Sequence, residues 1–185
     1  MVYRRGKAFT LIELVMSIAI LGVLAFSGFF VMVYLVRNSI FIPNKINMDM
    51  LTADALNIMV EGDGQAKGLR FSRAITDSQD NAVTFINQDG QTVSYRLDTG
   101  TNKLYRSIDS GAEENLPFYS SASGINMEGK SNKLFTYYDR NENTTTVASD
   151  VRRVGIALLA RTGTGDFDDW EAQSGQSTSI KVNRF

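Results

Sequence analysis

The chain opens with a long apolar run that ends where charged residues return. From Leu14 to Val36 there are 23 residues without a charge. A helix of that length, at about 1.5 Å per residue, crosses the roughly 30 Å hydrocarbon layer of a bilayer. Basic residues stand before the run at positions 4, 5 and 7, and positive charge on a short flank favours the cytoplasmic side. The pattern predicts one membrane-spanning helix with a cytoplasmic N-terminus and the rest of the chain outside.

Hydropathy alone leaves two ordinary alternatives open. The first is a cleaved secretory signal, for which residues 25–27 resemble a small-residue cleavage site, although the apolar run continues through them. The second is a plain single-pass anchor. Neither alternative explains Glu13, which lies one turn inside the apolar run, because a carboxylate deep in lipid costs about 2.5–3.5 kcal/mol. Glu13 is therefore a candidate functional residue.

Residues 37–61 continue the helical pattern, and Pro43 predicts an interruption or kink within it. Beyond Pro43, apolar residues recur at helical spacing and share one face. The members of this face are Met48, Leu51, Ala55, Ile58 and Met59. The glycines of Gly62-Asp63-Gly64 are expected to end the helix. Apolar positions between Gln65 and Ile75 suggest a short second helix.

After Asp77 the apolar period changes from about 3.6 to about 2, which is typical of strands. Residues 82–86 and 92–97 alternate, and Asp89-Gly90 between them is a hairpin signal. The sequence predicts further strands over residues 103–108, 133–138, 151–161 and 179–185. The apolar face of the strand over 151–161 consists of Val154, Ile156, Leu158 and Ala160.

Strands joined by short turns pair antiparallel. The predicted fold class is therefore α+β, with a long N-terminal helix packed on an antiparallel β-meander head. The first half of this helix is transmembrane and the second half is amphipathic. Residues 112–130 form the longest stretch without a regular pattern.

Charge and composition narrow the function classes. From Asn38 onward the chain has 15 basic and 19 acidic residues, a net charge of −4, so no nucleic-acid partner is expected. The chain has no cysteine and no histidine. This excludes disulfides, thiol nucleophiles, Cys/His zinc sites and histidine acid–base chemistry. Because the remaining residues show no catalytic spacing, the sequence predicts a protein that is not an enzyme and has no cofactor.

Two acidic stretches resemble calcium-binding loops. Residues 139–150 place oxygen atoms at several EF-hand positions, but Thr144 stands where such a loop needs glycine, and the flanks are predicted strands. The second stretch surrounds Trp170 and consists of Asp166, Asp168, Asp169 and Glu171. Both stretches are interpreted as solvated loops, so no metal site is predicted.

A specific motif surrounds Glu13. It reads Phe9-Thr10-Leu11-Ile12-Glu13-Leu14-Val15, follows Arg-Arg-Gly-Lys-Ala, and continues through residues 17–25. The stretch closely resembles the prepilin processing motif of type IV pilins and type II secretion pseudopilins. The likeness covers 17 residues from Phe9, so it indicates a superfamily and not one of its members.

In the family that this motif resembles, a membrane-embedded prepilin peptidase cuts before the phenylalanine and methylates the new N-terminus. The resemblance therefore implies cleavage between Ala8 and Phe9, and N-methylation of Phe9. Ala8 replaces the glycine that is usual in the family, which implies slower processing. The expected divisions are a cleaved cytoplasmic leader over residues 1–8, a helix over 9–61 of which 9–36 span the membrane, and a periplasmic β-rich head over 62–185.

The motif also suggests an assembly role for Glu13. After cleavage, Phe9 would carry an ammonium group among apolar helices. An acid four residues further on can pair with the ammonium of a neighbouring subunit or with its own. Since a paired buried charge is tolerated and an unpaired one is costly, Glu13 is predicted to set the register between subunits.

The predicted head resembles minor pilins and J- or W-type minor pseudopilins, where a strand ending in Tyr-Tyr-Asp precedes a long strand like that over 151–161. Major pilins often have proline where this chain has Phe30. The resemblance implies a structural minor subunit of a type IV pilus-like or type II secretion pseudopilus filament, held in the bacterial inner membrane before assembly. The expected partners are other pilin or pseudopilin subunits, prepilin peptidase, the inner-membrane assembly platform and the membrane. The alternative is a membrane-tethered module at a filament tip that binds DNA or a secreted substrate.

Overall fold

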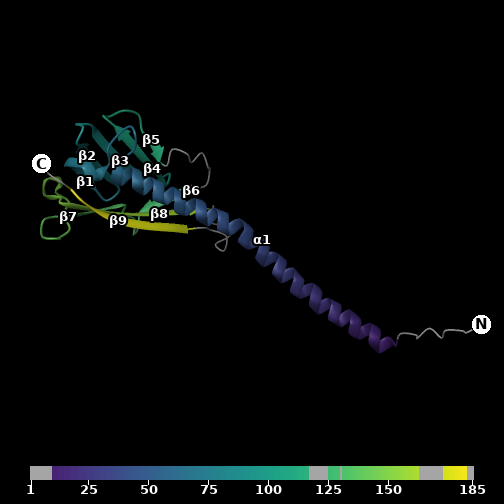
Figure 1. The fold of residues 1–185 in the computed structure, drawn as a ribbon. Coiled ribbons are helices and arrows are strands. Elements are labelled where there is room, and N and C mark those ends of the chain that lie inside the picture. Colours follow the sequence, from purple (N-terminus) through teal and green to yellow (C-terminus); the bar gives the residue numbers. More distant parts are fainter. Residues whose placement is uncertain (1–9, 117–124, 130, 163–172, 183–185) are drawn as a thin grey trace, which may run out of the picture. The chain divides into compact units, whose positions relative to one another are not determined.

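The computed structural model describes residues 10–116, 125–129, 131–162 and 173–182 (Figure 1). The chain divides into two compact units, residues 1–42 and residues 43–185. One helix, α1, runs from Leu11 to Glu61 and contains 51 residues. The predicted interruption near Pro43 is wrong, because α1 continues through that residue. Proline lacks one backbone donor, but the turns on both sides of Pro43 keep their helical geometry.

In the second unit, the part of α1 from Pro43 to Glu61 is amphipathic, as the sequence predicted. Met48, Ala55 and Met59 are buried, whereas Asp54 and Asn57 are exposed. Thr52 is also fully buried, and its hydroxyl donates to the carbonyl of Met48 at 2.6 Å. This hydrogen bond satisfies the buried hydroxyl of Thr52, which explains why threonine is tolerated on the buried face.

The predicted end of α1 is confirmed, and the predicted helix after it is wrong. The backbone N–H of Gly62 donates to the carbonyl of Ile58, and Gly62 has a φ of +91°. Between residues 65 and 75 the structure has only a 3₁₀ turn, η1 (Leu69–Phe71), before strand β1 (Ser72–Gln79) begins. A left-handed glycine after the last helical residue is a common helix stop.

The first sheet is an antiparallel meander in the strand order β1-β2-β3-β4-β5. After β1, its strands are β2 (Ala82–Asn87), β3 (Thr92–Asp98), β4 (Lys103–Ile108) and β5 (Glu114–Leu116). The predicted strands over 82–86, 92–97 and 103–108 are confirmed. Alternate residues of β2 and β3, including Val83, Phe85 and Tyr95, are fully buried, which is the period-2 burial that the sequence indicated.

The second sheet is built around one long strand. Its strands are β6 (Ile125–Gly129), β7 (Phe135–Tyr138), β8 (Arg153–Thr162) and β9 (Gln173–Lys181). β9 pairs with β8 over nine residue pairs. β6 and β7 pair with different halves of β8, at residues 158–162 and 153–156 respectively. The sequence predicted one meander, so the separate second sheet was not anticipated.

A single core joins α1 to both sheets within the second unit. It includes Ala55 and Met59 from α1, Phe85 and Tyr95 from the first sheet, and Ile156 from the second. The predicted apolar face of β8 is confirmed, since Val154, Ile156, Leu158 and Ala160 are all buried. The α+β fold class is therefore confirmed.

Candidate functional site

The structure describes the predicted assembly residue but not the predicted processing residues. Ala8 and Phe9 lie outside the described residues. Glu13 is described and lies in the first turn of α1. The geometry of the motif can therefore be built only from Thr10 onward.

Thr10 and Glu13 form a reciprocal cap at the start of α1. The backbone N–H and the hydroxyl of Thr10 both donate to Oε2 of Glu13, each at 3.0 Å. In return, the backbone N–H of Glu13 donates to Thr10 Oγ1 at 3.3 Å. This is a capping box, in which two donors that the helix cannot satisfy by itself are satisfied by side chains. The signal Thr-x-x-Glu was present in the sequence, but it was not used to predict this contact.

The helix that follows the cap presents an apolar surface. The segment from Leu11 to Ser39 contains 29 residues with a mean hydropathy of 2.5, long and apolar enough to cross a membrane. Its large apolar side chains are exposed, from 43% at Val33 to 82% at Leu11. Contiguous apolar surface of this extent requires lipid or other apolar helices around it.

Two serine hydroxyls in the apolar segment donate hydrogen bonds to backbone carbonyl groups of the same helix. The hydroxyl of Ser17 donates to the carbonyl of Glu13, and that of Ser27 to the carbonyl of Val23, each at 2.7 Å. Glu13 is the one acidic or basic side chain between Thr10 and Val36. Its carboxylate is therefore the feature of this helix that a surrounding apolar medium would penalise most.

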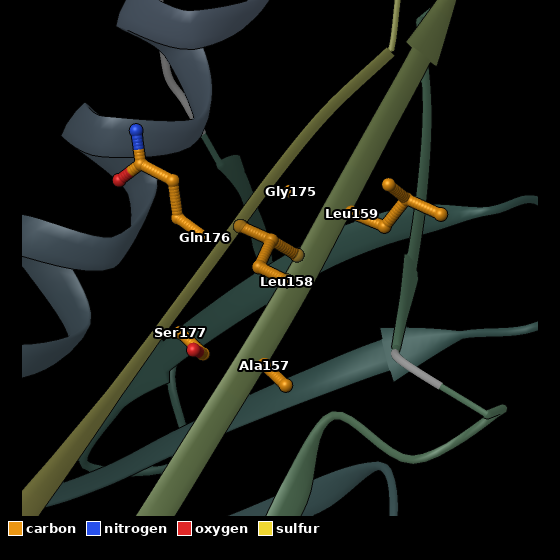
Figure 2. A pocket seen from close by; sticks show the side chains of 6 residues that line it. All are labelled: Ala157, Leu158, Leu159, Gly175, Gln176 and Ser177. Carbon is orange, nitrogen blue, oxygen red and sulfur yellow. The ribbon is translucent and has the colours of Figure 1, made fainter.

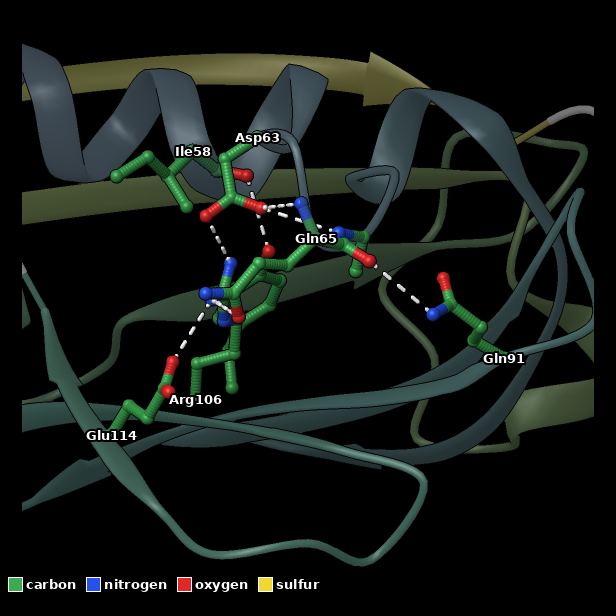
Figure 3. A network of polar contacts seen from close by, with 8 residues as sticks. Ile58, Asp63, Gln65, Gln91, Arg106 and Glu114 are labelled. Atoms are coloured by element: carbon green, nitrogen blue, oxygen red, sulfur yellow. Dashed lines mark hydrogen bonds and ion pairs between the residues drawn. The ribbon is translucent and has the colours of Figure 1, made fainter.

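A buried arginine forms a second polar cluster, in the head (Figure 3). The side chain of Arg106, on β4, is fully buried and contacts Asp63 at 2.7 Å and Glu114 at 3.0 Å. It also donates to Oε1 of Gln65 at 2.9 Å. Nearby, the hydroxyl of Tyr95 donates to the carbonyl of Ile58 at 3.1 Å. The cluster connects the end of α1 to the first sheet, and no part of the sequence pattern predicted it.

The surroundings of Asp63 and Tyr95 keep each side chain in one protonation state near neutral pH. Burial opposes ionisation of Asp63, but hydrogen bonds from Arg106 and from the backbone N–H groups of Gln65 and Ala66 outweigh it, so the pKa of Asp63 lies below its ordinary value. Burial raises the pKa of the Tyr95 hydroxyl above its ordinary range. A carboxylate that is ionised and a phenol that is protonated at neutral pH bind and position groups, but they do not exchange protons near neutral pH.

The loop over 139–150 uses its oxygen atoms internally. Oδ1 of Asp139 accepts from the backbone N–H groups of Asn141 and Asn143, at 2.8 and 2.9 Å. Glu142 forms an ion pair with Arg153. Within the described residues, no group of three or more acidic side chains is arranged to hold a metal ion. The second acidic cluster, around Trp170, lies outside the described residues.

A shallow hollow lies between β8 and β9 (Figure 2). It has a volume of about 270 Å³ and none of its lining residues carries a charge. The lining consists of Ala157, Leu158, Leu159, Gly175, Gln176 and Ser177. Two leucines, an alanine, a glycine and one amide offer no acid, base or nucleophile, and the serine hydroxyl has no base among these residues to activate it. The hollow therefore supports contact with another surface better than it supports catalysis.

The comparisons with known proteins agree with the geometry of the N-terminal segment. The family model described as the prokaryotic N-terminal methylation motif matches residues 3–29. No curated protein and no solved structure matches the chain. The matched residues include both partners of the Thr10–Glu13 cap and the first 19 of the 29 residues of the apolar segment. The chain therefore carries, at residues 3–29, the N-terminal methylation motif of the type IV pilin and pseudopilin superfamily.

Proposed function

We propose that this protein is a structural minor subunit of a type IV pilus-like or type II secretion pseudopilus filament. The observation that carries the proposal is the methylation motif at residues 3–29, which overlaps the exposed apolar helical segment over Leu11–Ser39. An exposed apolar helix needs a membrane before assembly and other helices after it. In this proposal residues 1–8 are a cytoplasmic leader, residues 9–36 span the inner membrane, and residues 62–185 form a periplasmic head.

Processing in this proposal takes place between Ala8 and Phe9, and prepilin peptidase then methylates Phe9. The Thr10–Glu13 cap supports this assignment, because both of its residues lie beyond the cut and the cap survives it. N-terminal mass spectrometry of the mature protein tests the assignment. We expect a chain that begins with N-methylated Phe9, and a mature chain that begins at Met1 or Lys7 contradicts it.

Glu13 is proposed to select the register between subunits. Both hydrogen bonds from Thr10 end on Oε2, so within the described part of the chain Oε1 keeps its capacity to accept. A carboxylate has about four acceptor positions. The same group can thus cap its own helix and accept from the N-terminal ammonium of a neighbouring subunit, which neutralises two charges in an apolar surrounding.

The test is to compare Glu13→Ala with Thr10→Ala in cells that carry the filament system. Glu13→Ala leaves the neighbouring ammonium unpaired, and breaking a buried pair costs about 3–5 kcal/mol. We expect membrane insertion to persist while incorporation into filaments falls at least about tenfold. Thr10→Ala removes the cap but keeps the charge, so its incorporation should stay within a few-fold of the native level. Native incorporation of Glu13→Ala would refute the proposed role.

A further inference from the structure

A polar cleft lies between the end of β1, in the first sheet, and β7, in the second. It has a volume of about 460 Å³, which is within the range of about 300–1,000 Å³ that is usual for small-molecule sites. One wall consists of residues 78–80, at the end of β1 and in the turn after it. The other walls consist of Lys133 with residues 135–137, and of residues 144–146 in the loop after β7.

Hydrogen bonds between the walls fix the shape of the cleft. The carbonyl of Asp80 accepts from the backbone N–H groups of residues 134–135, each at 2.9 Å, and this joins the turn after β1 to β7. The hydroxyl of Ser78 donates to the carbonyl of Thr146 at 2.8 Å, and this joins β1 to the loop. The cleft is therefore formed without a ligand, and a preformed site loses less conformational entropy when it binds one.

Three threonine side chains of the cleft keep their hydrogen-bonding capacity. Thr136 is half-buried, and Thr144 and Thr146 are exposed. Within the described residues, none of these three hydroxyls forms a hydrogen bond, whereas the hydroxyl of Thr145 accepts from the backbone N–H of Val147 at 3.1 Å. Because a hydroxyl both donates and accepts, the three groups suit a ligand whose own polar groups do the same.

The two charged side chains of the cleft compensate each other. Lys133 and Asp80 form an ion pair at 3.0 Å, and their side chains are 57% and 56% exposed. Exposed ion pairs contribute little to stability, so a ligand can insert between the two groups at low cost. The carboxylate accepts hydrogen bonds and the ammonium donates them. Since the pair has no net charge, it suits a neutral ligand better than an ionic one.

Other classes of ligand fit the cleft less well. A ligand with phosphate groups needs several cations, and the one cation in the lining is already paired. A peptide that adds a strand needs an open backbone edge, but β1 has two register shifts, and on β7 the carbonyl of Tyr137 accepts from the N–H of Thr145. An acyl chain needs exposed apolar surface, whereas the aromatic residues of the lining, Phe135 and Tyr137, are at most 4% exposed.

We propose that this cleft binds a neutral saccharide. Sugar hydroxyls donate and accept hydrogen bonds, so they match the hydroxyls of Thr136, Thr144 and Thr146. They can also accept from the ammonium of Lys133 and donate to the carboxylate of Asp80 without leaving a charge unpaired. The proposal rests on residues of the head alone and is independent of the role in a filament.

Nuclear magnetic resonance of the full chain in dodecylphosphocholine micelles tests the proposal, because this detergent carries no sugar. Threonine labelled with ¹³C at its methyl group places a probe on each of the three residues, and Thr84, on β2, is the internal reference. We expect millimolar maltose or chitobiose to shift the methyl signals of Thr136, Thr144 and Thr146 and not that of Thr84. The more effective disaccharide distinguishes a plain glucan from a glycan of N-acetylated sugars. Absence of these shifts with both disaccharides overturns the proposal.

Variants without a hydroxyl test the contacts one by one. Thr144→Val and Thr146→Val keep the β-branched shape at exposed positions, so the fold should persist. Each should weaken saccharide binding about threefold or more, because a sugar hydroxyl loses a partner. Thr178→Val, on β9 and outside the cleft, is the matched control and should leave the Kd unchanged. Equal weakening by all three variants, or none by the first two, contradicts the proposed contacts.

Triglycine tests the competing class of ligand. A zwitterionic peptide would pair its ammonium with Asp80 and its carboxylate with Lys133, and salt would weaken its binding. We expect triglycine to leave the three threonine signals unchanged, and saccharide binding to be insensitive to salt. Shifts with triglycine and with neither disaccharide would show a peptide site and overturn the proposal. Because Glu13→Ala tests assembly through another part of the chain, the saccharide site and the filament role can fail independently.

Discussion

Arg106 carries a buried positive charge that its acidic neighbours compensate. Its guanidinium is fully buried between an acid on the loop after α1 and an acid on β5. A buried charge is tolerated only when counter-charges and hydrogen bonds replace water. Asp63 adds a second function, because its Oδ1 also accepts from the backbone N–H groups of Gln65 and Ala66. One carboxylate thus fixes both the loop and the arginine.

Replacing Arg106 should destabilise the head strongly. Arg106→Met leaves Asp63 and Glu114 without their cation, and we expect unfolding to become easier by about 2–3 kcal/mol. Arg96→Met is the matched control, because Arg96 pairs with Glu113 at the surface and exposed pairs contribute at most about 1 kcal/mol. Urea unfolding followed by circular dichroism measures both variants. Equal effects would show that burial of Arg106 is energetically unimportant.

The lowered pKa of Asp63 predicts the direction of acid destabilisation. A carboxyl group whose folded-state pKa is depressed contributes stability that is complete above its unfolded pKa, about 3.9. That contribution is lost as the pH falls through the folded-state value. Asp63→Asn should therefore lower stability at neutral pH and reduce the loss of stability as the pH falls below the unfolded-state pKa. Parallel acid curves for the native chain and the variant would contradict this account.

At the scale of elements, the turn after α1 depends on two glycines in different ways. Gly62 has a positive φ, and a Cβ on it would lie 2.2 Å from the carbonyl oxygen of Ala66. A Cβ on Gly64 would meet nothing within 4 Å. Gly62 therefore fixes the path of the chain from the helix into the first sheet, while Gly64 merely occupies the turn.

Alanine at these two positions should have unequal effects. Gly62→Ala forces a backbone shift and should cost more than about 2 kcal/mol. Gly64→Ala should change stability by less than about 0.5 kcal/mol. Thermal unfolding of the two variants under identical conditions provides the comparison. A tolerated Gly62→Ala would mean that the loop has another low-energy path.

Several elements could be predicted from the sequence because local pattern and final burial agree. The strands β2, β3 and β4 alternate cleanly and are separated by recognisable turns. β1 could not be predicted, since its two register shifts place buried residues at Ser72, Ile75 and Ser78. That spacing of three lacks the period of about 2 that predicts a strand. The short helix was predicted instead from the apolar positions between Gln65 and Ile75.

The start of β9 was missed for a different reason. Its composition is almost entirely serine, threonine, glutamine and glycine, so it has little hydrophobic pattern. It forms a strand because it pairs with the edge of β8. Pairing with a strand that is distant in the sequence cannot be predicted from a short stretch of the chain. In the candidate site, the sequence pointed to Glu13 because it is an acid in an apolar run. Its hydrogen bonds with Thr10 could have been predicted only from the capping pattern Thr-x-x-Glu as well.

At the scale of the whole molecule, the part of α1 from Pro43 to Glu61 belongs to the compact unit that contains both sheets. It supplies Met48, Ala55 and Met59 to the buried core. These residues cannot be removed without exposing the apolar faces of the strands. The predicted boundary at residue 62 therefore separates secondary structure types, while the compact unit begins at residue 43.

Two fragments distinguish these boundaries. We expect a fragment of residues 43–185 to be soluble and to unfold cooperatively, because it contains the complete compact unit. A fragment of residues 62–185 should lack a cooperative transition, since deleting a buried helix removes several core side chains at once. Calorimetry of the two fragments checks this expectation. Cooperative unfolding of the shorter fragment would show that α1 is dispensable for the head.

The arrangement of β8 has a consequence for the order in which the head folds. The first sheet is made from strands adjacent in sequence, so its hairpins can close one after another along the chain. The second sheet cannot, because β8 is completed only by β9, whose residues follow the whole of β8 in the chain. Until β9 is available, β8 keeps an unpaired edge nine residues long. Chains truncated before residue 173 should therefore be the forms of this protein most prone to associate through their strands.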